Sequence, residues 1–318
     1  MYREIAPARR DPAHPLITPR SGEDFWWEEN GTFNPGVTEY QGKILLLYRA
    51  YDRFHVSRFG LATSQDGIQF TRRTLPIIDT DPDNPYERLG IEDPRITKLG
   101  DTYYIFHTSA SYHRLGQPSD VASPHEHVPW RVRFGLQTTR DWQQFKNYGV
   151  LLPDIPAKNA CLFPEKIDGS FALLYREHMH IEDAEHEVVK LTLTDDWHTF
   201  RDTRTITWPT PEPWQQSKFG LGTPPLRVHN GWLLVYHAVD ANSIYRLGLM
   251  MLHAEDPSQI AWVSNPILEP KLPYEKEGFI PNVVYACGAL VRGQELWIYY
   301  GAADRIIARA ILPLAGIL

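Results

Sequence analysis

Five glycine-containing turns recur along the chain at intervals of about 60 residues. Each glycine is followed by a short apolar run that is typical of a β-strand. The five glycines are Gly42, Gly100, Gly169, Gly231 and Gly293. Because the repeat extends over nearly the whole sequence, it predicts one repeat architecture and one domain spanning residues 1–318 rather than a pair of unrelated domains.

Further repeats indicate about four strands in each unit. An Asp-x-x-x-Phe pattern occurs at residues 66–70, 141–145 and 196–200, and each copy follows an alternating run. The pairs Asp168-Gly169 and Asn230-Gly231 are typical of two-residue hairpins. Four strands per unit in a closed ring predict an all-β fold, a five-bladed β-propeller. Residues 15–19 are expected to close this ring, as the N-terminal strand of the blade that contains Trp297.

The composition and net charge of the chain limit the classes of partner and the cellular compartment that we expect. A net charge of −7 and a pI of about 6.0 argue against nucleic acid as the main partner. Two cysteines give no disulfide framework, and no apolar run is long enough to cross a bilayer, so we expect a cytoplasmic protein. No set of metal ligands is evident and no cofactor is expected. A homo-oligomer is compatible with the sequence.

Basic side chains end four of the five strands that follow the glycine turns. They are Arg49, His107, Arg176 and His237. Equivalent positions in a ring of repeats lie near its axis, so these side chains are expected to converge there. The segments that lead into the turns all contain proline, which belongs at a strand start or edge because it has no N–H to donate. This places Asn34, Asp93, Glu165 and Asn282 near the mouth of the axial channel.

The sequence GIEDPRIT at residues 90–97 resembles the signature of glycoside hydrolase family 130, which contains β-mannoside phosphorylases and related β-mannosidases. Other similar stretches occur in the same order along nearly the whole chain, at residues 33–35, 47–50, 162–167, 218–220, 224–225, 231–237 and 299–304. The family has a five-bladed propeller fold, in agreement with the repeats.

The resemblance implies a role for individual residues. Asp93 matches the single catalytic acid, which protonates the departing glycosidic oxygen through a sugar hydroxyl. The residues matching the phosphate site are Arg176, Lys218, His237 and Lys158, the last at a position that is often arginine in the family. Lysine is a point charge and lacks the planar fork of arginine. The expected sugar contacts are Asn34, Arg49, Asn159, Tyr236 and Asp304.

The residue types themselves favour phosphorolysis. Inverting hydrolysis needs a second carboxyl to activate water, whereas phosphate is already an anionic nucleophile and needs cations to hold it. Because Asp93 must be protonated to act, we expect burial, or a neighbouring carboxylate such as Glu92 or Asp304, to raise its pKa against the effect of the cations. Inorganic phosphate is then the co-substrate and a β-mannoside the substrate.

Two alternatives remain open from the sequence. One is an inverting β-mannosidase with Glu165, Glu177 or Glu182 as the base. The other is a sugar-binding or scaffold propeller without catalysis, which predicts aromatic side chains at the mouth but no carboxyl group facing a basic cluster. Taken singly, Arg49, Arg176 and His237 are also compatible with ion pairs between blades. The sequence does not decide the mannosidic linkage.

Overall fold

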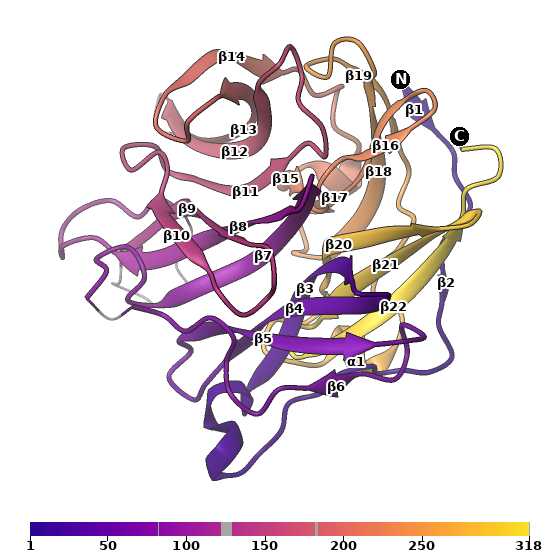
Figure 1. The fold of residues 1–318 in the computed structure, drawn as a ribbon. Coiled ribbons are helices and arrows are strands. Elements are labelled where there is room, and N and C mark those ends of the chain that lie inside the picture. Colours follow the sequence, from indigo (N-terminus) through magenta and orange to yellow (C-terminus); the bar gives the residue numbers. More distant parts are fainter. Residues whose placement is uncertain (82, 122–128, 182–183, 318) are drawn as a thin grey trace.

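The computed structural model describes residues 1–317 except 82, 122–128 and 182–183. The described chain is built almost entirely of β-strands (Figure 1). Among these described residues the helical elements are one short α-helix, α1 (Pro273–Lys276), and two 3₁₀ helices, η1 (Glu23–Glu28) and η2 (Pro213–Gln215). None of the described helices is long and apolar enough to span a membrane. The all-β fold predicted from the sequence is confirmed.

The described strands form four sheets, in which antiparallel pairing between consecutive strands defines five units along the chain. The first two units share one eight-stranded sheet, because Ser57 and Gly90 pair in parallel between them. The first unit contains β3 (Gly31–Tyr40), β4 (Lys43–Tyr51), β5 (Ser57–Ser64) and β6 (Thr71–Arg72). The second contains β7 (Gly90–Leu99), β8 (Thr102–Tyr112), β9 (Trp130–Thr139) and β10 (Lys146–Val150). The third contains β11 (Ala157–Leu162), β12 (Phe171–Ile181), β13 (Ala184–Thr194) and β14 (Phe200–Ile206).

The last two units differ slightly from this plan. In the fourth, β15 (Lys218–Leu221) and β16 (Leu226–Val228) both pair with β17 (Gly231–Val239), followed by β18 (Tyr245–His253) and β19 (Ile260–Ser264). The fifth contains β20 (Val284–Arg292), β21 (Glu295–Ala302) and β22 (Ile306–Pro313), with β2 (Arg9–Arg10) as its outer strand. The N-terminal β1 (Tyr2–Arg3) pairs in parallel with β19.

The N-terminal segment therefore completes the fifth unit, but not in the register expected. The longer pairing is made by Arg9 and Arg10 with β22, whereas residues 15–19 contribute a single bridge between Ile17 and Ile307. The prolines at both ends of this segment cannot donate a backbone hydrogen bond, which limits the length of its ladder. The predicted strand at residues 15–19 is thus correct in its location and wrong in its extent.

The turn predicted at Asp168-Gly169 forms as its residue types dictate, whereas the one predicted at Asn230-Gly231 is shifted by one residue, because Val228 pairs with Gly231 and the turn consists of His229 and Asn230. Gln41 and Gly42 both have positive φ, as do Asp168 and Gly169, which matches the tight turn favoured between antiparallel strands. The carboxylates of the Asp-x-x-x-Phe repeats accept hydrogen bonds from the backbone of their own turns. Asp66, for example, accepts hydrogen bonds of 2.8 Å from the backbone N–H groups of Ile68 and Gln69. These aspartates are turn elements and are not available for chemistry.

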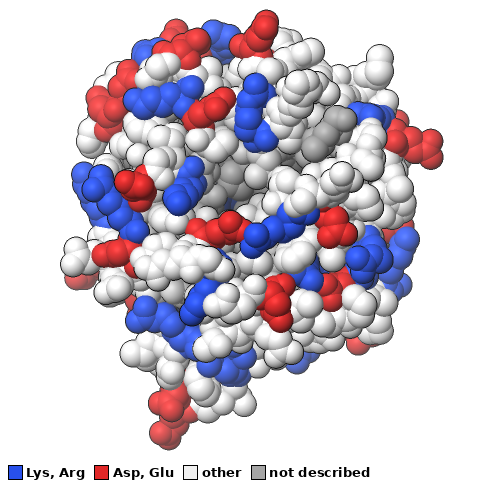
Figure 2. Space-filling view, turned by 45° about the vertical axis from the view of Figure 1, so that its right-hand side comes forward, with Lys and Arg blue, Asp and Glu red and all other residues white. Residues whose placement is uncertain are grey.

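Five apolar clusters each join two neighbouring units, and the series returns from the fifth unit to the first. Pairs that represent the five interfaces are Leu47 and Ile105, Phe106 and Leu173, Leu174 and Leu234, Leu249 and Ile298, and Tyr299 with Leu46. The first strands also contact one another, since β3 touches both β7 and β20, and β11 touches β7 and β15. On the face drawn in Figure 2, acidic and basic side chains are interspersed.

Candidate active site

A cavity of about 180 Å³ receives side chains from all five units. Most of them are polar. Except for Tyr245 at the start of β18, they come from the first two strands of each unit or from the segments that flank these strands. The lining residues are Asn34, Arg49, Glu92, Asp93, Lys158, Arg176, Lys218, His237, Tyr245, Ile280, Val283, Tyr285 and Asp304. The cavity therefore brings together most of the residues selected from the sequence.

Three polar side chains in or beside the cavity stand on bulges in the first strands of successive units. Asn34, Asp93 and Asn159 have φ values of 47°, 55° and 58°. At each of them the pairing with the second strand shifts register. A bulge re-aims a side chain and bends the strand, and Asn and Asp tolerate the left-handed region better than other side chains with a Cβ. The same local device thus positions an Asn, an Asp and an Asn in three units.

Asp93 lies within a network of buried polar groups. Asn34 Nδ2 donates a hydrogen bond of 2.8 Å to Asp93 Oδ1, and Arg49 Nη1 lies 3.5 Å from the same oxygen. Arg49 Nη2 also donates to Glu92 Oε1 at 2.7 Å, so one guanidinium bridges two neighbouring carboxylates. Asp304 completes a set of three carboxyl groups in the cavity.

The three carboxyl groups differ in their affinity for a proton. The pKa of Asp93 lies below its usual value. Burial acts to raise this pKa, but Arg49, Arg95 and the hydrogen bond from Asn34 together outweigh the effect of burial. Burial raises the pKa of Glu92, with Arg49 opposing and Asp93 reinforcing the rise. Burial also raises the pKa of Asp304, to about 7. The expected rise for Asp93 is therefore wrong for the free protein, because its cationic neighbours outweigh its burial.

A cluster of basic side chains lines another part of the same cavity. Lys158 and Arg176 are direct cross-strand neighbours, and Arg176 Nη1 lies 3.4 Å from His237 Nε2. Burial, reinforced by Arg176 and Lys218, lowers the pKa of Lys158 to about 8, and burial lowers the pKa of His237 well below its usual value. Crowding cations in a buried site costs free energy that a bound anion would offset.

The neutral His237 presents a defined donor to this cluster. Because a guanidinium can only donate, His237 Nε2 accepts from Arg176 and the ring hydrogen lies on Nδ1. His237 Nδ1 and Arg176 Nε are both buried, and neither has a hydrogen-bond partner among the described residues. Two orphaned donors beside two lysines form a site suited to an oxyanion.

Comparison with known proteins decides the family. A family model for glycoside hydrolase family 130, described as β-1,4-mannooligosaccharide phosphorylase, matches residues 7–318. The chain belongs to glycoside hydrolase family 130. It is 36% identical over 311 residues to a 1,2-β-oligomannan phosphorylase of Thermoanaerobacter sp. (strain X514), covering 95% of this chain and 96% of the relative.

Two further relatives agree with this assignment. A β-1,2-mannobiose phosphorylase of the same Thermoanaerobacter strain is 33% identical over 94% of both chains. The solved structure of a β-1,2-mannobiose phosphorylase from Listeria innocua, in complex with β-1,2-mannobiose, superposes with a TM-score of 0.82 at 28% identity and covers 97% of both chains. The family resemblance inferred from the sequence is confirmed.

Tyr236, which we expected to contact the sugar, lies outside the cavity. Its ring packs within the core between the third and fourth units, above Gly248 of the next strand. Its hydroxyl donates to the Ser264 carbonyl at 3.1 Å and accepts from Gln215 at 2.7 Å. Successive side chains of a strand point to opposite faces, so the neighbouring His237 reaches the cavity and Tyr236 does not.

His107, which we expected near the axis with the other basic side chains, also points away from the cavity, because side chains alternate along a strand. Phe33 is paired with Arg49 and Glu92 with Thr108, so the position equivalent to Arg49 in the second unit is Thr108. His107 packs above Gly135, 3.9 Å from the buried Glu87. The one-residue offset turns its side chain to the other face of the sheet.

The remaining sequence candidates occupy supporting or outer positions. Asn159 stands behind the cavity lining, where its Nδ2 donates to the Tyr285 hydroxyl at 2.9 Å. Glu165 is exposed and pairs with Arg227 at 3.6 Å. Glu177 is absent from the cavity lining, and Glu182 lies outside the described residues. The first two glutamates proposed as a hydrolytic base are therefore not placed to activate water in this cavity.

Gly220 is a functional position that the sequence does not reveal, although it belongs to the motif at residues 218–220. A Cβ at this position would lie 2.5 Å from Arg176 Nη1, 2.7 Å from Asn159 Oδ1 and 2.7 Å from His237 Cε1. The glycine thus lets β15 approach the basic cluster closely. Only the close approach of Arg176 and His237 in the folded chain makes this requirement visible.

We expect Gly220→Ala to displace Arg176 and His237 and to raise the KM for phosphate by roughly 10-fold or more, since charge-assisted contacts depend on geometry. Initial-rate kinetics at varied phosphate concentration would measure this KM. Gly135→Ala is the matched control, because its Cβ would meet His107 outside the cavity. An equal change in both variants would mean that the effect is general destabilisation.

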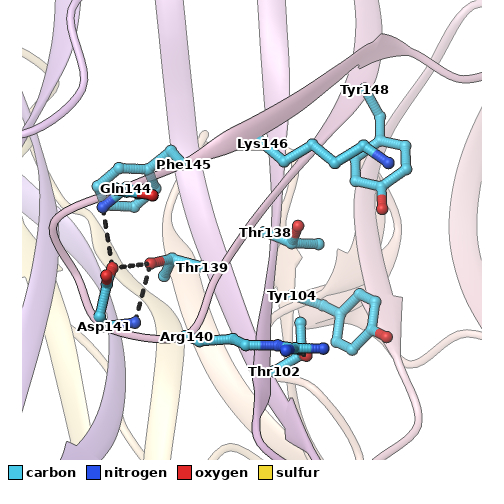
Figure 3. Close-up of a pocket in the computed structure, with 10 residues that line it drawn as sticks. All are labelled: Thr102, Tyr104, Thr138, Thr139, Arg140, Asp141, Gln144, Phe145, Lys146 and Tyr148. Atoms are coloured by element: carbon cyan, nitrogen blue, oxygen red, sulfur yellow. Dashed lines mark hydrogen bonds between the residues drawn. The ribbon is translucent and has the colours of Figure 1, made fainter.

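A larger hollow on the outer part of the second unit does not carry comparable chemistry. It measures about 560 Å³ and is lined by residues of β8, β9 and β10 and the turn between the last two (Figure 3). Its carboxylate, Asp141, accepts hydrogen bonds of 2.9 Å from the backbone of Gln143 and Gln144. Size alone therefore does not mark the active site of this protein.

Proposed function

We propose that this member of family 130 catalyses the inverting phosphorolysis of β-linked mannosides to α-mannose 1-phosphate. One observation carries the proposal: a set of buried carboxyl groups and a cluster of basic side chains share a single cavity. Phosphorolysis needs both parts, an acid for the leaving group and cations for the nucleophile. Inorganic phosphate is the co-substrate, and the chemistry requires no further cofactor.

We further propose that the fold is one five-bladed β-propeller domain over residues 1–318, with the N-terminal strand completing the last blade. The support is the closed series of five interfaces, together with β2 pairing on β22. In a propeller the first strand of each blade lines the axis, which would explain why all five units contribute to one cavity.

The proposed reaction uses Asp93 as the general acid. A phosphate oxygen attacks the anomeric carbon of the mannosyl residue while the bond from that carbon to the glycosidic oxygen breaks. Asp93 supplies the proton that the departing oxygen takes up, and the configuration at the anomeric carbon inverts. Lys158, Arg176, Lys218 and His237 hold the phosphate and balance its charge. No base is needed, because the nucleophile is already an anion.

Substrate binding would supply the protonation state that the free protein disfavours. Arg49 and Arg95 are the principal cations that lower the pKa of Asp93, and Lys158 adds to their effect. A phosphate anion bound beside Lys158 offsets part of this positive field and raises the pKa of Asp93 towards the range of a general acid. The order of protonation among Glu92, Asp93 and Asp304 is therefore coupled to ligand binding.

We assign the sugar to the side of the cavity formed by Asn34, Arg49 and Asp304, next to the acid. Asn159 holds Tyr285 in the cavity wall and acts as a positioning residue. Because two relatives above 30% identity are named for β-1,2-linked substrates, β-1,2-mannobiose and β-1,2-oligomannan are the first substrates to test. A cytoplasmic location is consistent with two free, buried cysteines.

Phosphate dependence tests the proposal. We expect β-1,2-mannobiose to be cleaved rapidly with inorganic phosphate and hardly at all without it, with β-1,3- and β-1,4-mannobiose as linkage controls. Equal cleavage with and without phosphate would favour the mannosidase, and no cleavage of any mannoside would favour a binding protein.

The lowered pKa of Lys158 predicts that the use of phosphate by the enzyme depends on pH. The ammonium is charged below a pKa of about 8 and neutral above it, so we expect kcat/KM for phosphate to fall as the pH rises beyond that value. Lys158→Arg keeps its charge at alkaline pH and should shift this fall upwards by about one pH unit or more. The same alkaline limb in both proteins would show that another group causes it.

A further inference from the structure

Three aromatic side chains pack together at the rim of the cavity and form what we call the rim patch. The ring centroids of Tyr51, His55 and Phe279 lie 4.6, 5.3 and 5.5 Å apart in the three pairs. Tyr51 is buried and its hydroxyl donates to the Asp304 carbonyl at 3.2 Å, whereas Phe279 is 44% exposed. Phe279 directly precedes Ile280. Because both Ile280 and Asp304 line the cavity and are partly exposed, the rim patch borders its mouth.

The exposed aromatic surface continues from the rim patch onto a groove of about 400 Å³. Trp26 of η1 and Phe54 line this groove and are 44% and 70% exposed. The other lining residues are mostly polar or charged: Gly22, Glu23, Glu29, Asp52 and Arg53. Phe54 directly precedes His55, so one loop joins the groove to the rim patch. Aromatic rings beside hydrogen-bonding groups suit a pyranose, whose ring has apolar faces and polar edges.

The loop that carries Phe54 and His55 owes its shape to backbone contacts. It connects β4 to β5, and Asp52 Oδ1 accepts hydrogen bonds of 2.8 and 3.1 Å from the N–H groups of Phe54 and Val56. The fourth unit repeats this loop at residues 240–244, between β17 and β18. Its aspartate accepts the two equivalent bonds at 2.8 and 3.1 Å, and the fourth residue of each loop has a φ of 60°.

The two loops differ in their side chains. Asn242 and Ser243 stand in the fourth unit where Phe54 and His55 stand in the first. The loop therefore keeps its shape without aromatic rings, and the fold does not explain why they are present. Single exposed apolar residues are common on proteins, but a gathered set of them beside a cavity is typical of a ligand-binding surface.

The proposed reaction gives the direction in which the leaving part of the substrate extends. Inversion places the phosphate and the departing oxygen on opposite sides of the anomeric carbon. The basic cluster that would hold the phosphate belongs to the third and fourth units. The sugars attached to the departing oxygen therefore extend away from it, towards the first and fifth units. The rim patch lies on this side, since His55 follows β4 and Phe279 precedes β20.

We propose that the rim patch and the groove bind mannosyl units of a β-mannooligosaccharide beyond the two of mannobiose, on the leaving side of the chain. His55 and Phe279 contact the sugar that emerges from the mouth, and Phe54 and Trp26 contact those that follow. The protein accordingly favours chains longer than mannobiose, because only these reach the groove. This inference rests on the proposed function, which supplies the direction of the chain.

The dependence of kcat/KM on chain length tests the inference. We would compare β-1,2-mannotetraose with β-1,2-mannobiose at saturating phosphate and expect the native protein to favour the tetraose. The double variant Phe54→Asn/His55→Ser copies the loop of the fourth unit and should fold. It should lower the ratio of the two kcat/KM values by roughly 10-fold, the upper range for one aromatic contact. We expect Phe279→Ala to lower this ratio similarly.

Val291→Ala is the matched control. Val291 is 42% exposed, but it stands at the end of β20 that is remote from the cavity residue Val283, so its removal should leave the ratio unchanged. A ratio that falls in the aromatic variants and not in Val291→Ala would support the inference. A native protein without preference for the tetraose, or a ratio unchanged in the aromatic variants, would overturn it.

Calorimetric titration with the two sugars in the absence of phosphate separates the inference from the function on which it rests. Tighter binding of the tetraose that is lost in the aromatic variants would support the binding surface even if no mannoside were cleaved with phosphate. That failure of cleavage would contradict the proposed function alone. Equal affinity of the native protein for both sugars would overturn the inference, whatever the outcome of the cleavage assay.

Discussion

Asp93→Asn is expected to lower the phosphorolysis of β-mannobiose by roughly 10²-fold or more, because a positioned general acid is lost. Asparagine has nearly the same shape, tolerates the φ of 55° at this bulge and can still bond to Asn34. Arg49 keeps its contact with Glu92, so its guanidinium stays paired with a carboxylate. Steady-state kinetics and thermal unfolding of the purified variant would measure the two effects separately.

A substrate with an activated leaving group is the control for the Asp93→Asn variant. An activated aryl mannoside needs little protonation, so Asp93→Asn should cleave it much better, relative to the native enzyme, than it cleaves mannobiose. Asp141→Asn removes a carboxylate of an outer turn and should leave both activities unchanged. Near-native cleavage of mannobiose by Asp93→Asn would show that another group is the acid, and loss of folding would indicate a structural role.

Arg176→Ala is expected to raise the KM for phosphate by roughly 10²-fold, since a buried, charge-assisted contact is worth about 1.5–3 kcal/mol. The loss also removes the cation that lies 3.2 Å from the carboxylate of Glu187 on β13, which adds repulsion. The KM for the mannoside should change much less, because Arg176 lies in the basic cluster and not beside Asp93. Initial rates with each substrate varied in turn would separate the two constants.

Arg201→Ala is the matched control for Arg176. Arg201 belongs to the same unit, but it is exposed and pairs with Asp195 and Asp202 at the surface. We expect its removal to leave both KM values unchanged, as for most exposed ion pairs. If Arg176→Ala binds phosphate as the native enzyme does, the basic cluster does not hold the nucleophile.

The periodic features of the sequence predicted the fold well, because each has a local physical cause. The glycine turns require a positive φ, and the Asp-x-x-x-Phe segments close on their own backbone. Asp93, Arg176, Lys218 and His237 could be selected because they belong to short motifs at strand entrances or ends. Their shared cavity follows from the repetition of one topology around the molecule.

The sequence did not reveal features that depend on register or on contacts between distant segments. Tyr236 and His107 were assigned to the wrong face because a shift of one residue reverses a side chain. The lowered pKa of Asp93 depends on Arg49 and Arg95, whose distances exist only in the folded chain. Glu187 reaches the basic cluster through strand pairing, and no motif marks it.

The identity of the sugar product tests the central claim most directly. We would follow β-1,2-mannobiose and inorganic phosphate with the native enzyme by proton and phosphorus magnetic resonance. The account predicts that α-mannose 1-phosphate and free mannose form together in equal amounts from the first time points. Formation of mannose alone, or of a β-configured phosphate ester, would contradict it.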